Sequence, residues 1–290
     1  MARHLITCAV AVGVAAVTVT GFAMQAAAAE SGALRVLFQG YVNRQGHSAV
    51  ATLGAQGIAD VRDVPVANGG ELSPDGRRLA FDTCRGAERA IAIAALDGSG
   101  VRLVAPVDGE MCVIVRWSRD GHHLSYAGGH DLMLHVIDLD TGANMQLQNT
   151  FLTASFHSWS PGSDAVAYSP GRGGSRRIDI IDLSTWQTRT LVSPEQFGTC
   201  EVWGPDWSPV DHRIAFTTCD GRLFTVNADG TGLTQMVGVT SAYAPRWSPD
   251  GQTLFFLTNG RLMRVTEGGG PHLVARLPFR GGPFSLAPLN

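Results

Sequence analysis

The sequence predicts an all-β protein that repeats one four-stranded unit, and three observations support this fold class. First, the 290-residue chain contains 35 Gly and 14 Pro, a composition typical of many short strands joined by tight turns. Second, its apolar residues after residue 30 show no helical period. Third, a hairpin motif centred on Trp-Ser recurs at separations of 40 to 48 residues, a spacing typical of repeated supersecondary units. Together they predict a six-bladed β-propeller.

Each repeat starts with a constant hairpin. A bulky apolar residue, called the anchor below, ends the first strand and is followed by serine; the anchors are Leu72, Trp117, Trp159, Trp207 and Trp247. An aromatic residue follows nine positions later in every copy: Phe81, Tyr126, Tyr168, Phe216 and Phe256. Because wedge-shaped blades need large residues between them, we expect the anchors to pack in the core rather than to stack on a ligand.

Turn residues divide each repeat into strands. Pro74-Asp75-Gly76 and Pro249-Asp250-Gly251 are complete hairpin turns, because Pro presets φ, Asp bonds its own backbone and Gly accepts a positive φ. The expected third strands are 91–93, 132–139, 178–183, 223–227 and 262–265. The expected fourth strands are 102–105, 146–148, 188–192, 234–237 and 272–275.

A sixth unit is divided between the two ends of the chain. Residues 34–38, 49–53 and 58–64 resemble second, third and fourth strands without a first. Near the other end, Pro283-Phe284-Ser285 resembles the sequence around Trp247, which places Phe284 in the anchor position. We therefore expect the C-terminal strand to complete the N-terminal blade and close the ring. The expected blades are 33–66 with 281–290, 67–106, 110–149, 153–193, 200–238 and 241–277.

Residues 1–29 have the pattern of a secretory signal peptide. A basic start precedes an apolar run from Leu5 to Met24, and the small residues before Glu30 supply a cleavage site. We expect export by the general secretory route, a secreted or cell-envelope location, no membrane span after cleavage, and a single domain over residues 30–290. The alternative is an uncleaved membrane anchor, since the apolar run is long enough to cross a bilayer.

The W-S-P-D-G hairpins resemble the WD-repeat-like motif of TolB-type propellers, and the resemblance covers nearly all of residues 33–290. It implies six blades. TolB itself carries a separate α/β domain before its propeller, whereas here only a few residues lie between the expected cleavage site and the first strand. The resemblance implies no single activity, because the same blades serve binding proteins, peptidase gates and sugar lyases.

Four cysteines remain after the expected cleavage, and an even count in an exported chain indicates disulfides. Cys84 and Cys219 each follow a second-strand aromatic by three residues, whereas Cys112 and Cys200 each lie just before a first strand. We expect both positions on one face of the propeller, with bridges Cys200–Cys219 and Cys84–Cys112. Metal binding by these separated cysteines is the alternative.

Candidate contact residues are expected on the same face, at the mouth of the central channel. They are Trp203, Tyr243, His130, His157, Arg172 and Arg176. The two aromatic residues each lie four positions before an anchor, and the arginines belong to a Gly- and Arg-rich loop that suits an anion or an acidic partner segment. His47 is a further histidine expected near the mouth. The alternatives are core packing for the aromatic residues and a solvated loop for the arginines.

Polar residues stand directly before the five anchors, and we expect them to line the channel and pair with one another. They are Glu71, Arg116, Ser158, Asp206 and Arg246.

The sequence favours a binding protein over an enzyme. A formal charge of -3 argues against nucleic-acid binding, and neither an H-E-x-x-H, a G-x-S-x-G nor a phosphate-binding loop occurs. We expect a secreted, monomeric, non-enzymatic scaffold that binds a protein, a peptide or an envelope component, without a cofactor or a metal. The alternative is a propeller enzyme of the lyase, lactonase or glycosidase type, with a metal or an acid/base site in the central funnel.

Overall fold

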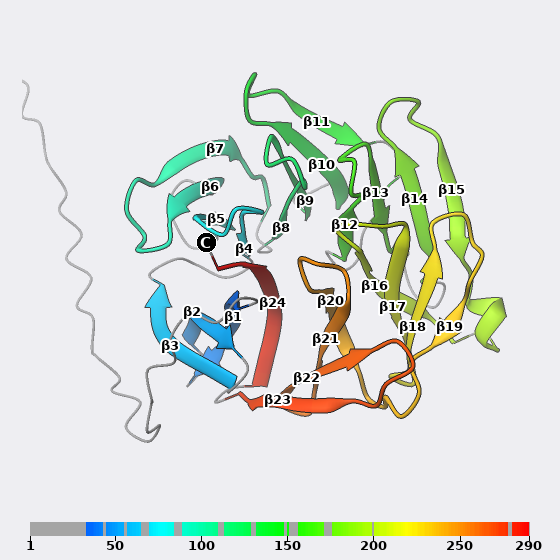
Figure 1. Cartoon of the computed structure of the whole chain (residues 1–290). Helices are drawn as coiled ribbons and strands as arrows, with labels where there is room; N and C mark the ends of the chain where they lie inside the picture. The colour runs from blue at the N-terminus through cyan, green and yellow to red at the C-terminus, as the bar shows by residue number, and fades with distance from the viewer. Residues whose placement is uncertain are drawn as a thin grey trace, which may run out of the picture.

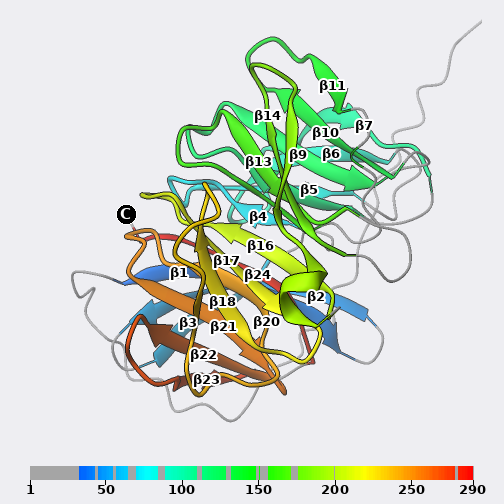
Figure 2. The ribbon, with the colours of Figure 1, turned by 90° about the vertical axis from the view of Figure 1, so that its right-hand side faces the viewer.

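The computed structural model is a ring of six antiparallel, four-stranded sheets, viewed along the central channel in Figure 1. The structure describes residues 33–42, 45–54, 57–64, 70–83, 89–109, 113–128, 132–147, 150, 156–170, 176–198, 200–277 and 280–289. The six-bladed β-propeller is therefore confirmed, and the side view in Figure 2 shows the strands of successive blades fanning around the ring.

The strands of each blade are given from the channel outward. Blade 1 contains β24 (Arg280–Pro288), β1 (Leu34–Val42), β2 (Gln45–Gly54) and β3 (Gly57–Val64); blade 2 contains β4 (Glu71–Leu72), β5 (Arg78–Asp82), β6 (Ala90–Ala95) and β7 (Arg102–Pro106). Blade 3 contains β8 (Ile114–Trp117), β9 (His123–Gly128), β10 (Met133–Asp138) and β11 (Asn144–Leu147); blade 4 contains β12 (His157–Trp159), β13 (Ala165–Tyr168), β14 (Ile178–Asp182) and β15 (Thr188–Val192). Blade 5 contains β16 (Val202–Trp207), β17 (Arg213–Thr218), β18 (Leu223–Asn227) and β19 (Thr234–Gln235); blade 6 contains β20 (Tyr243–Trp247), β21 (Thr253–Thr258), β22 (Arg261–Thr266) and β23 (His272–Arg276). A short 3-10 helix, η1 (Pro194–Phe197), connects blades 4 and 5.

The constant hairpin has one local cause, which is the serine after the anchor. The Ser118 hydroxyl donates to an Asp120 carboxylate oxygen at 2.5 Å and accepts a hydrogen bond from the His123 backbone N–H at 2.8 Å. The equivalent bonds recur around Ser73 and Ser248. In all five of these blades the backbone N–H of this serine donates to the carbonyl five residues later, as Ser118 does to His123. The turn therefore has one length, and the interval between the anchor and the following aromatic residue is constant.

The anchors pack between blades, as expected. Trp159, for example, lies in a cluster that joins Leu134 and Val136 of blade 3 to Val166 and Tyr168 of blade 4. All five anchors and all five aromatic partners are buried. Burial of such large side chains contributes roughly 1.5–3 kcal/mol each, so the inter-blade clusters supply much of the stability of the ring.

Strand β24 closes the ring by pairing with β1, but the predicted register is wrong by two residues. In the other blades each anchor pairs with the residue seven positions later, as Trp117 does with Leu124. In blade 1 it is Leu286 that pairs with the equivalent residue, Val36, while Phe284 lies opposite Phe38. The pairing with β1 sets this register. The resemblance of Pro283-Phe284-Ser285 to the sequence around Trp247 does not determine it. Leu286 therefore holds the anchor position, and Ser285 the position before it.

Blade 5 ends its fourth strand earlier than predicted. β19 stops at Gln235, because Val237 and Gly238 form a turn in which Gly238 has φ +75°. Within the described residues, no helix is long and apolar enough to span a membrane. The expected signal peptide lies outside the described residues and stays a prediction.

The disulfide Cys200–Cys219 is present, with the two Cα atoms 5.6 Å apart. It joins the segment before β16 to the residue after β17 and so clamps one end of this hairpin. Cys84 and Cys112 lie outside the described residues, and their bridge stays a prediction.

Removal of this disulfide is expected to lower the free energy of unfolding by about 3 kcal/mol, because the cross-link restricts the unfolded chain over a loop of moderate length. The Cys200→Ser/Cys219→Ser double variant, compared with the oxidised wild type by urea unfolding, measures the loss. An unchanged unfolding midpoint would show that the bridge adds nothing to stability.

Candidate functional site

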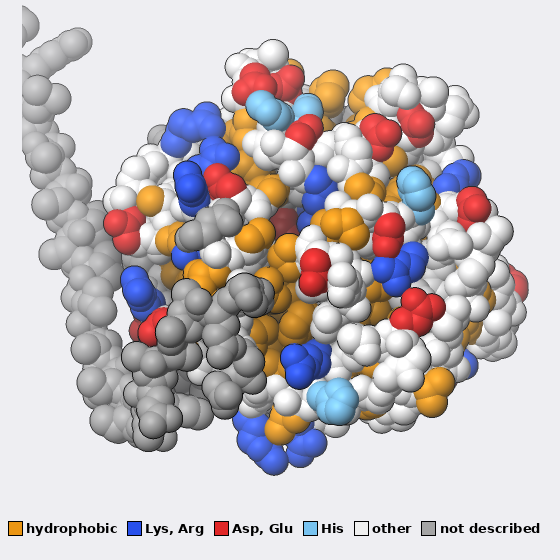
Figure 3. Space-filling view, in the orientation of Figure 1, with side chains coloured by type: hydrophobic (Ala, Val, Ile, Leu, Met, Phe, Trp, Pro, Cys, Tyr) orange, Lys and Arg blue, Asp and Glu red, His pale blue; other side chains and the backbone are white. Residues whose placement is uncertain are grey.

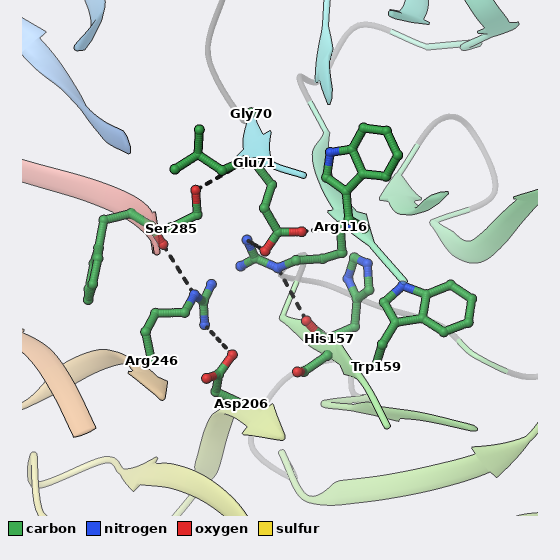
Figure 4. Close-up of polar contacts among 12 residues, drawn as sticks. Gly70, Glu71, Arg116, His157, Trp159, Asp206, Arg246 and Ser285 are labelled. Carbon is green, nitrogen blue, oxygen red and sulfur yellow. Dashed lines mark hydrogen bonds and ion pairs between the residues drawn. The ribbon is translucent and has the colours of Figure 1, made fainter. Parts of the chain in front are cut away.

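The centre of the propeller carries a ring of six polar residues, one from the innermost strand of each blade. Each lies directly before the anchor position of its blade, and they are called the channel ring below. In the order of the blades they are Ser285, Glu71, Arg116, Ser158, Asp206 and Arg246. Figure 4 labels five of them, all except Ser158. Five of them are those expected from the sequence, and Ser285 joins them through the corrected register of β24.

Four members of the channel ring accept a hydrogen bond from the next blade. The donor in each case is the backbone N–H of the next anchor. The bonds run from Leu72 to Ser285 (3.0 Å), from Trp117 to Glu71 (2.5 Å), from Trp207 to Ser158 (2.9 Å) and from Trp247 to Asp206 (2.7 Å). Each N–H faces the channel at the inner edge of its sheet, so the ring satisfies backbone groups that the sheets leave unpaired.

The two arginines of the channel ring also form hydrogen bonds to the next blade, but as donors to a backbone carbonyl. Arg116 Nε donates to the carbonyl of His157 at 3.3 Å, and Arg246 Nε donates to the carbonyl of Phe284 at 3.2 Å. Each guanidinium also forms an ion pair with a carboxylate of the preceding blade. The nitrogen–oxygen distance is 3.4 Å between Arg116 and Glu71 and 3.3 Å between Arg246 and Asp206. Burial, and next the charge of Arg246, lower the pKa of Arg116 to about 10, so it remains cationic at neutral pH.

The channel ring repeats a Ser–acid–Arg triplet twice around its circumference. Ser285, Glu71 and Arg116 form one half, and Ser158, Asp206 and Arg246 form the other, with matching contacts in each half. Two carboxylates balance two guanidiniums. Every member of the channel ring bonds to a neighbouring blade, so the ring holds adjacent blades together. This agrees with the pairing expected from the sequence.

His157 lies in the interior, 1% exposed, rather than at the channel mouth. Its Nε2 is 2.8 Å from the Ser125 hydroxyl, which also accepts a hydrogen bond from Trp159 Nε1 at 2.8 Å. His157, two residues before the anchor Trp159, pairs with Tyr168, and Tyr168 packs against blade 3. Both side chains therefore face the neighbouring blade. His157 therefore stabilises the contact between blades 3 and 4 and does not fit a role in contacting a partner.

Trp203 and Arg176 come together at the disulfide-bearing end of blade 5. The Arg176 guanidinium lies over the Trp203 ring, 5.2 Å from its centroid, and its Nε is 4.0 Å from a Glu201 carboxylate oxygen. Backbone bonds hold both segments, because Val202 N–H donates to the Arg176 carbonyl and Cys219 N–H to the Glu201 carbonyl. All three side chains are partly exposed.

Trp203 and Tyr243 stand on equivalent β-bulges of blades 5 and 6. The register of β16 shifts between Trp203 and Asp206, and that of β20 shifts between Tyr243 and Arg246. In each bulge the residue that follows has a left-handed backbone conformation: φ is +66° at Gly204 and +50° at Ala244. Bulges re-aim side chains and are frequent beside functional sites. Tyr243 is half-buried, and burial raises its pKa.

The other predicted contact residues are not placed. His130 and Arg172 lie outside the described residues, and only the backbone of His47 is described, in β2. Within the described part of the chain, no three His, Cys, Asp or Glu side chains gather in a way that would hold a metal ion. On the face seen in Figure 1, hydrophobic side chains gather around the centre of the ring (Figure 3).

No protein-family model and no curated protein sequence matches the chain. Solved structures do. TolB from Acinetobacter baumannii aligns with a TM-score of 0.69 and 15% identity, covering 89% of this chain and 67% of that one. The putative TolB from Agrobacterium tumefaciens gives 0.63 and 18%, covering 86% and 90%.

Two further structures share the fold. A chain of the nidogen/laminin complex gives a TM-score of 0.69 at 10% identity, covering 89% of this chain and 99% of that one. Oligogalacturonate lyase from Vibrio parahaemolyticus gives 0.55 at 15%, covering 84% and 73%. The chain thus has the closed six-bladed propeller fold of the TolB structures, as the W-S-P-D-G hairpins predicted.

Proposed function

We propose that this protein is an extracytoplasmic binding scaffold that holds a protein or peptide segment on the face bearing the Cys200–Cys219 disulfide. The observation that carries the proposal is the paired presentation of Trp203 and Tyr243 on equivalent bulges of adjacent blades. Tryptophan, tyrosine and arginine are the residue types that dominate binding energy at protein interfaces. Arg176, over the Trp203 ring, adds the third.

The rigidity of this face supports the same conclusion. The disulfide, the backbone bonds around Glu201 and the closed ring hold Trp203 in place before any partner arrives. A surface fixed in advance loses little conformational freedom on binding, so more of the contact energy appears as affinity. The disulfide also favours an oxidising compartment, in agreement with the signal-peptide pattern of residues 1–29.

One of the comparisons supports a binding role. The nidogen/laminin structure is a complex in which a propeller of this shape takes part. One observation favours the enzymatic alternative, the shared fold with oligogalacturonate lyase. Against it, both channel-ring carboxylates, Glu71 and Asp206, are engaged by a backbone N–H and an arginine. A general acid or base needs a carboxylate that is open to the substrate.

Variants at the bulges test the proposal. The wild-type protein is used to isolate its partner from envelope fractions, and binding is then measured with the purified partner. Trp203→Ala and Tyr243→Ala are each expected to weaken binding at least about tenfold, the effect of losing an interface hot spot.

The matched control is Val210→Ala. Val210 is 57% exposed and lies in the turn at the other end of the same β16–β17 hairpin. Its replacement is expected to leave binding unchanged. Equal binding by all three variants would place the partner site elsewhere on the molecule.

A further inference from the structure

A second site is suggested by a pocket between blades 3 and 4, away from the channel ring. Its volume is about 520 Å³, within the range of roughly 300–1,000 Å³ typical of small-molecule sites. Gln146 of β11 lines one side, and residues of β13, β14, β15 and the β14–β15 turn line the other. Figure 1 shows the β10–β11 and β14–β15 hairpins as neighbouring projections of the rim.

Trp186 holds an unusual position at this pocket. It occupies the left-handed position of the β14–β15 turn, at φ 60°, with its N–H bonded to the Asp182 carbonyl at 2.9 Å. The equivalent turn of blade 3 has Gly142 there, at φ 75° and with the same bond at 2.8 Å, and the turns of blades 2 and 5 have Gly98 and Gly230. A left-handed backbone is unfavourable for a residue with a Cβ atom, and such outliers cluster at binding sites.

The Trp186 side chain is also exposed to solvent rather than packed in the core. It is 48% exposed, whereas the four tryptophan anchors are buried. The fold therefore places a large flat apolar surface at the pocket, in a backbone conformation that glycine would adopt more easily.

Besides the apolar surfaces of Trp186, Tyr168 and Ile181, the lining is polar and carries no net charge. Arg177 Nε donates to both carboxylate oxygens of Asp179, at 2.8 and 3.0 Å, and Asp179 is itself buried. Thr190 Oγ1 donates to the same carboxylate at 2.9 Å. Because the single carboxylate is already paired with the single guanidinium, neither a cation nor an anion gains an unopposed partner here. The guanidinium has further N–H donors beyond Nε.

The lining residues follow one face of blade 4. Arg177, Asp179 and Ile181 alternate along the chain, with Tyr168 opposite Asp179 and Thr188 opposite Ile181. At roughly 3.3 Å per residue, the span from Arg177 to Ile181 is about 13 Å. The lining therefore runs along β14 from Arg177 to Ile181, with Trp186 in the turn that follows this strand.

We propose that this pocket binds a neutral oligosaccharide, with one sugar ring stacked on Trp186 and hydroxyl groups bonded to Arg177, Thr188 and Gln146. A pyranose ring has an apolar C–H face that packs on an aromatic ring, and hydroxyls that both donate and accept hydrogen bonds. This combination matches a lining of one exposed aromatic face and a charge-balanced row of donors and acceptors.

Calorimetric titration of the purified full chain with cellotriose, maltotriose and triacetylchitotriose tests the proposal, with trigalacturonate as the acidic comparison. At least one neutral trisaccharide is expected to bind with a Kd below about 1 mM. Trp186→Gly is expected to weaken that binding at least tenfold without lowering the melting temperature, since glycine suits the left-handed turn. Trp186→Phe keeps an aromatic face and is expected to bind within about threefold of wild type.

A second variant, Trp186→Leu, removes the aromatic face but keeps the apolar bulk, and is expected to lose binding as the glycine variant does. The proposal is overturned if no neutral trisaccharide binds at concentrations up to about 10 mM, or if the glycine and leucine variants bind as well as wild type. Tighter binding of trigalacturonate than of every neutral trisaccharide overturns it as well. The face bearing Trp203 is unaffected by these variants, so this result is separate from the partner-binding test.

Discussion

Replacing Asp206 by alanine is expected to lower the free energy of unfolding by about 3–5 kcal/mol, the usual loss when one partner of a buried ion pair is removed. Asp206 accepts from the Trp247 N–H and pairs with Arg246, and all three residues are buried. The variant leaves a buried guanidinium without its carboxylate and a buried N–H without its acceptor. Chemical denaturation followed by tryptophan fluorescence gives the value.

The matched control for this prediction is Ser158→Ala. Ser158 holds the equivalent N–H, that of Trp207, but without a charge. Its loss is expected to lower the free energy of unfolding by only about 1–2 kcal/mol. If the two variants lost the same amount, the ion pairs of the channel ring would add nothing to the neutral hydrogen bonds.

Gly76→Ala is expected to lower the free energy of unfolding by about 4 kcal/mol, because two costs add. A left-handed residue with a Cβ atom costs roughly 1–2 kcal/mol, and a steric clash in a packed region adds about 1–3 kcal/mol. Gly76 has φ +67°, and a Cβ there would lie 2.6 Å from the Pro288 carbonyl oxygen. Pro288 belongs to β24, so the clash falls on the strand that closes the ring.

Gly121→Ala separates the two costs. Gly121 occupies the same turn position in blade 3, at φ +75°, with nothing within 4 Å of an added Cβ. Its replacement is expected to lower the free energy of unfolding by only about 1 kcal/mol. Equal losses in both variants would show that Gly76 is not held against β24, and would contradict the observed closure of the ring.

The fold was predictable from the sequence because its determinants are local and repeated. The serine after each anchor fixes the turn, and the turn fixes the interval to the next buried aromatic residue, as around Ser118. The register of β24 was not predictable in this way. It depends on pairing with β1 near the other end of the chain, where Val36 is 250 residues from its partner Leu286. The likeness of Pro283-Phe284-Ser285 to a motif in another blade carries no information about that pairing.

The candidate site was predictable only in part. The spacing from the anchors identified Trp203 and Tyr243, but the bulges that aim them depend on hydrogen bonding across the hairpin. His157 was expected at the mouth, yet it is enclosed by blade 3, a neighbour that the spacing alone does not reveal. Trp186 was not among the residues predicted from the sequence. An alignment of the turns between the third and fourth strands shows a tryptophan where other blades have Gly98, Gly142 and Gly230.

Site-specific photo-crosslinking tests the proposed binding face most directly. A benzophenone amino acid replaces Glu201, which is partly exposed and two residues before Trp203, in one protein, and Val210 in another. Each protein is irradiated with envelope fractions of the producing cell. The two positions lie at opposite ends of the same β16–β17 hairpin. We expect a discrete covalent adduct with one protein from position 201 and none from position 210. Adducts of equal yield from both positions, or from position 210 alone, would contradict it.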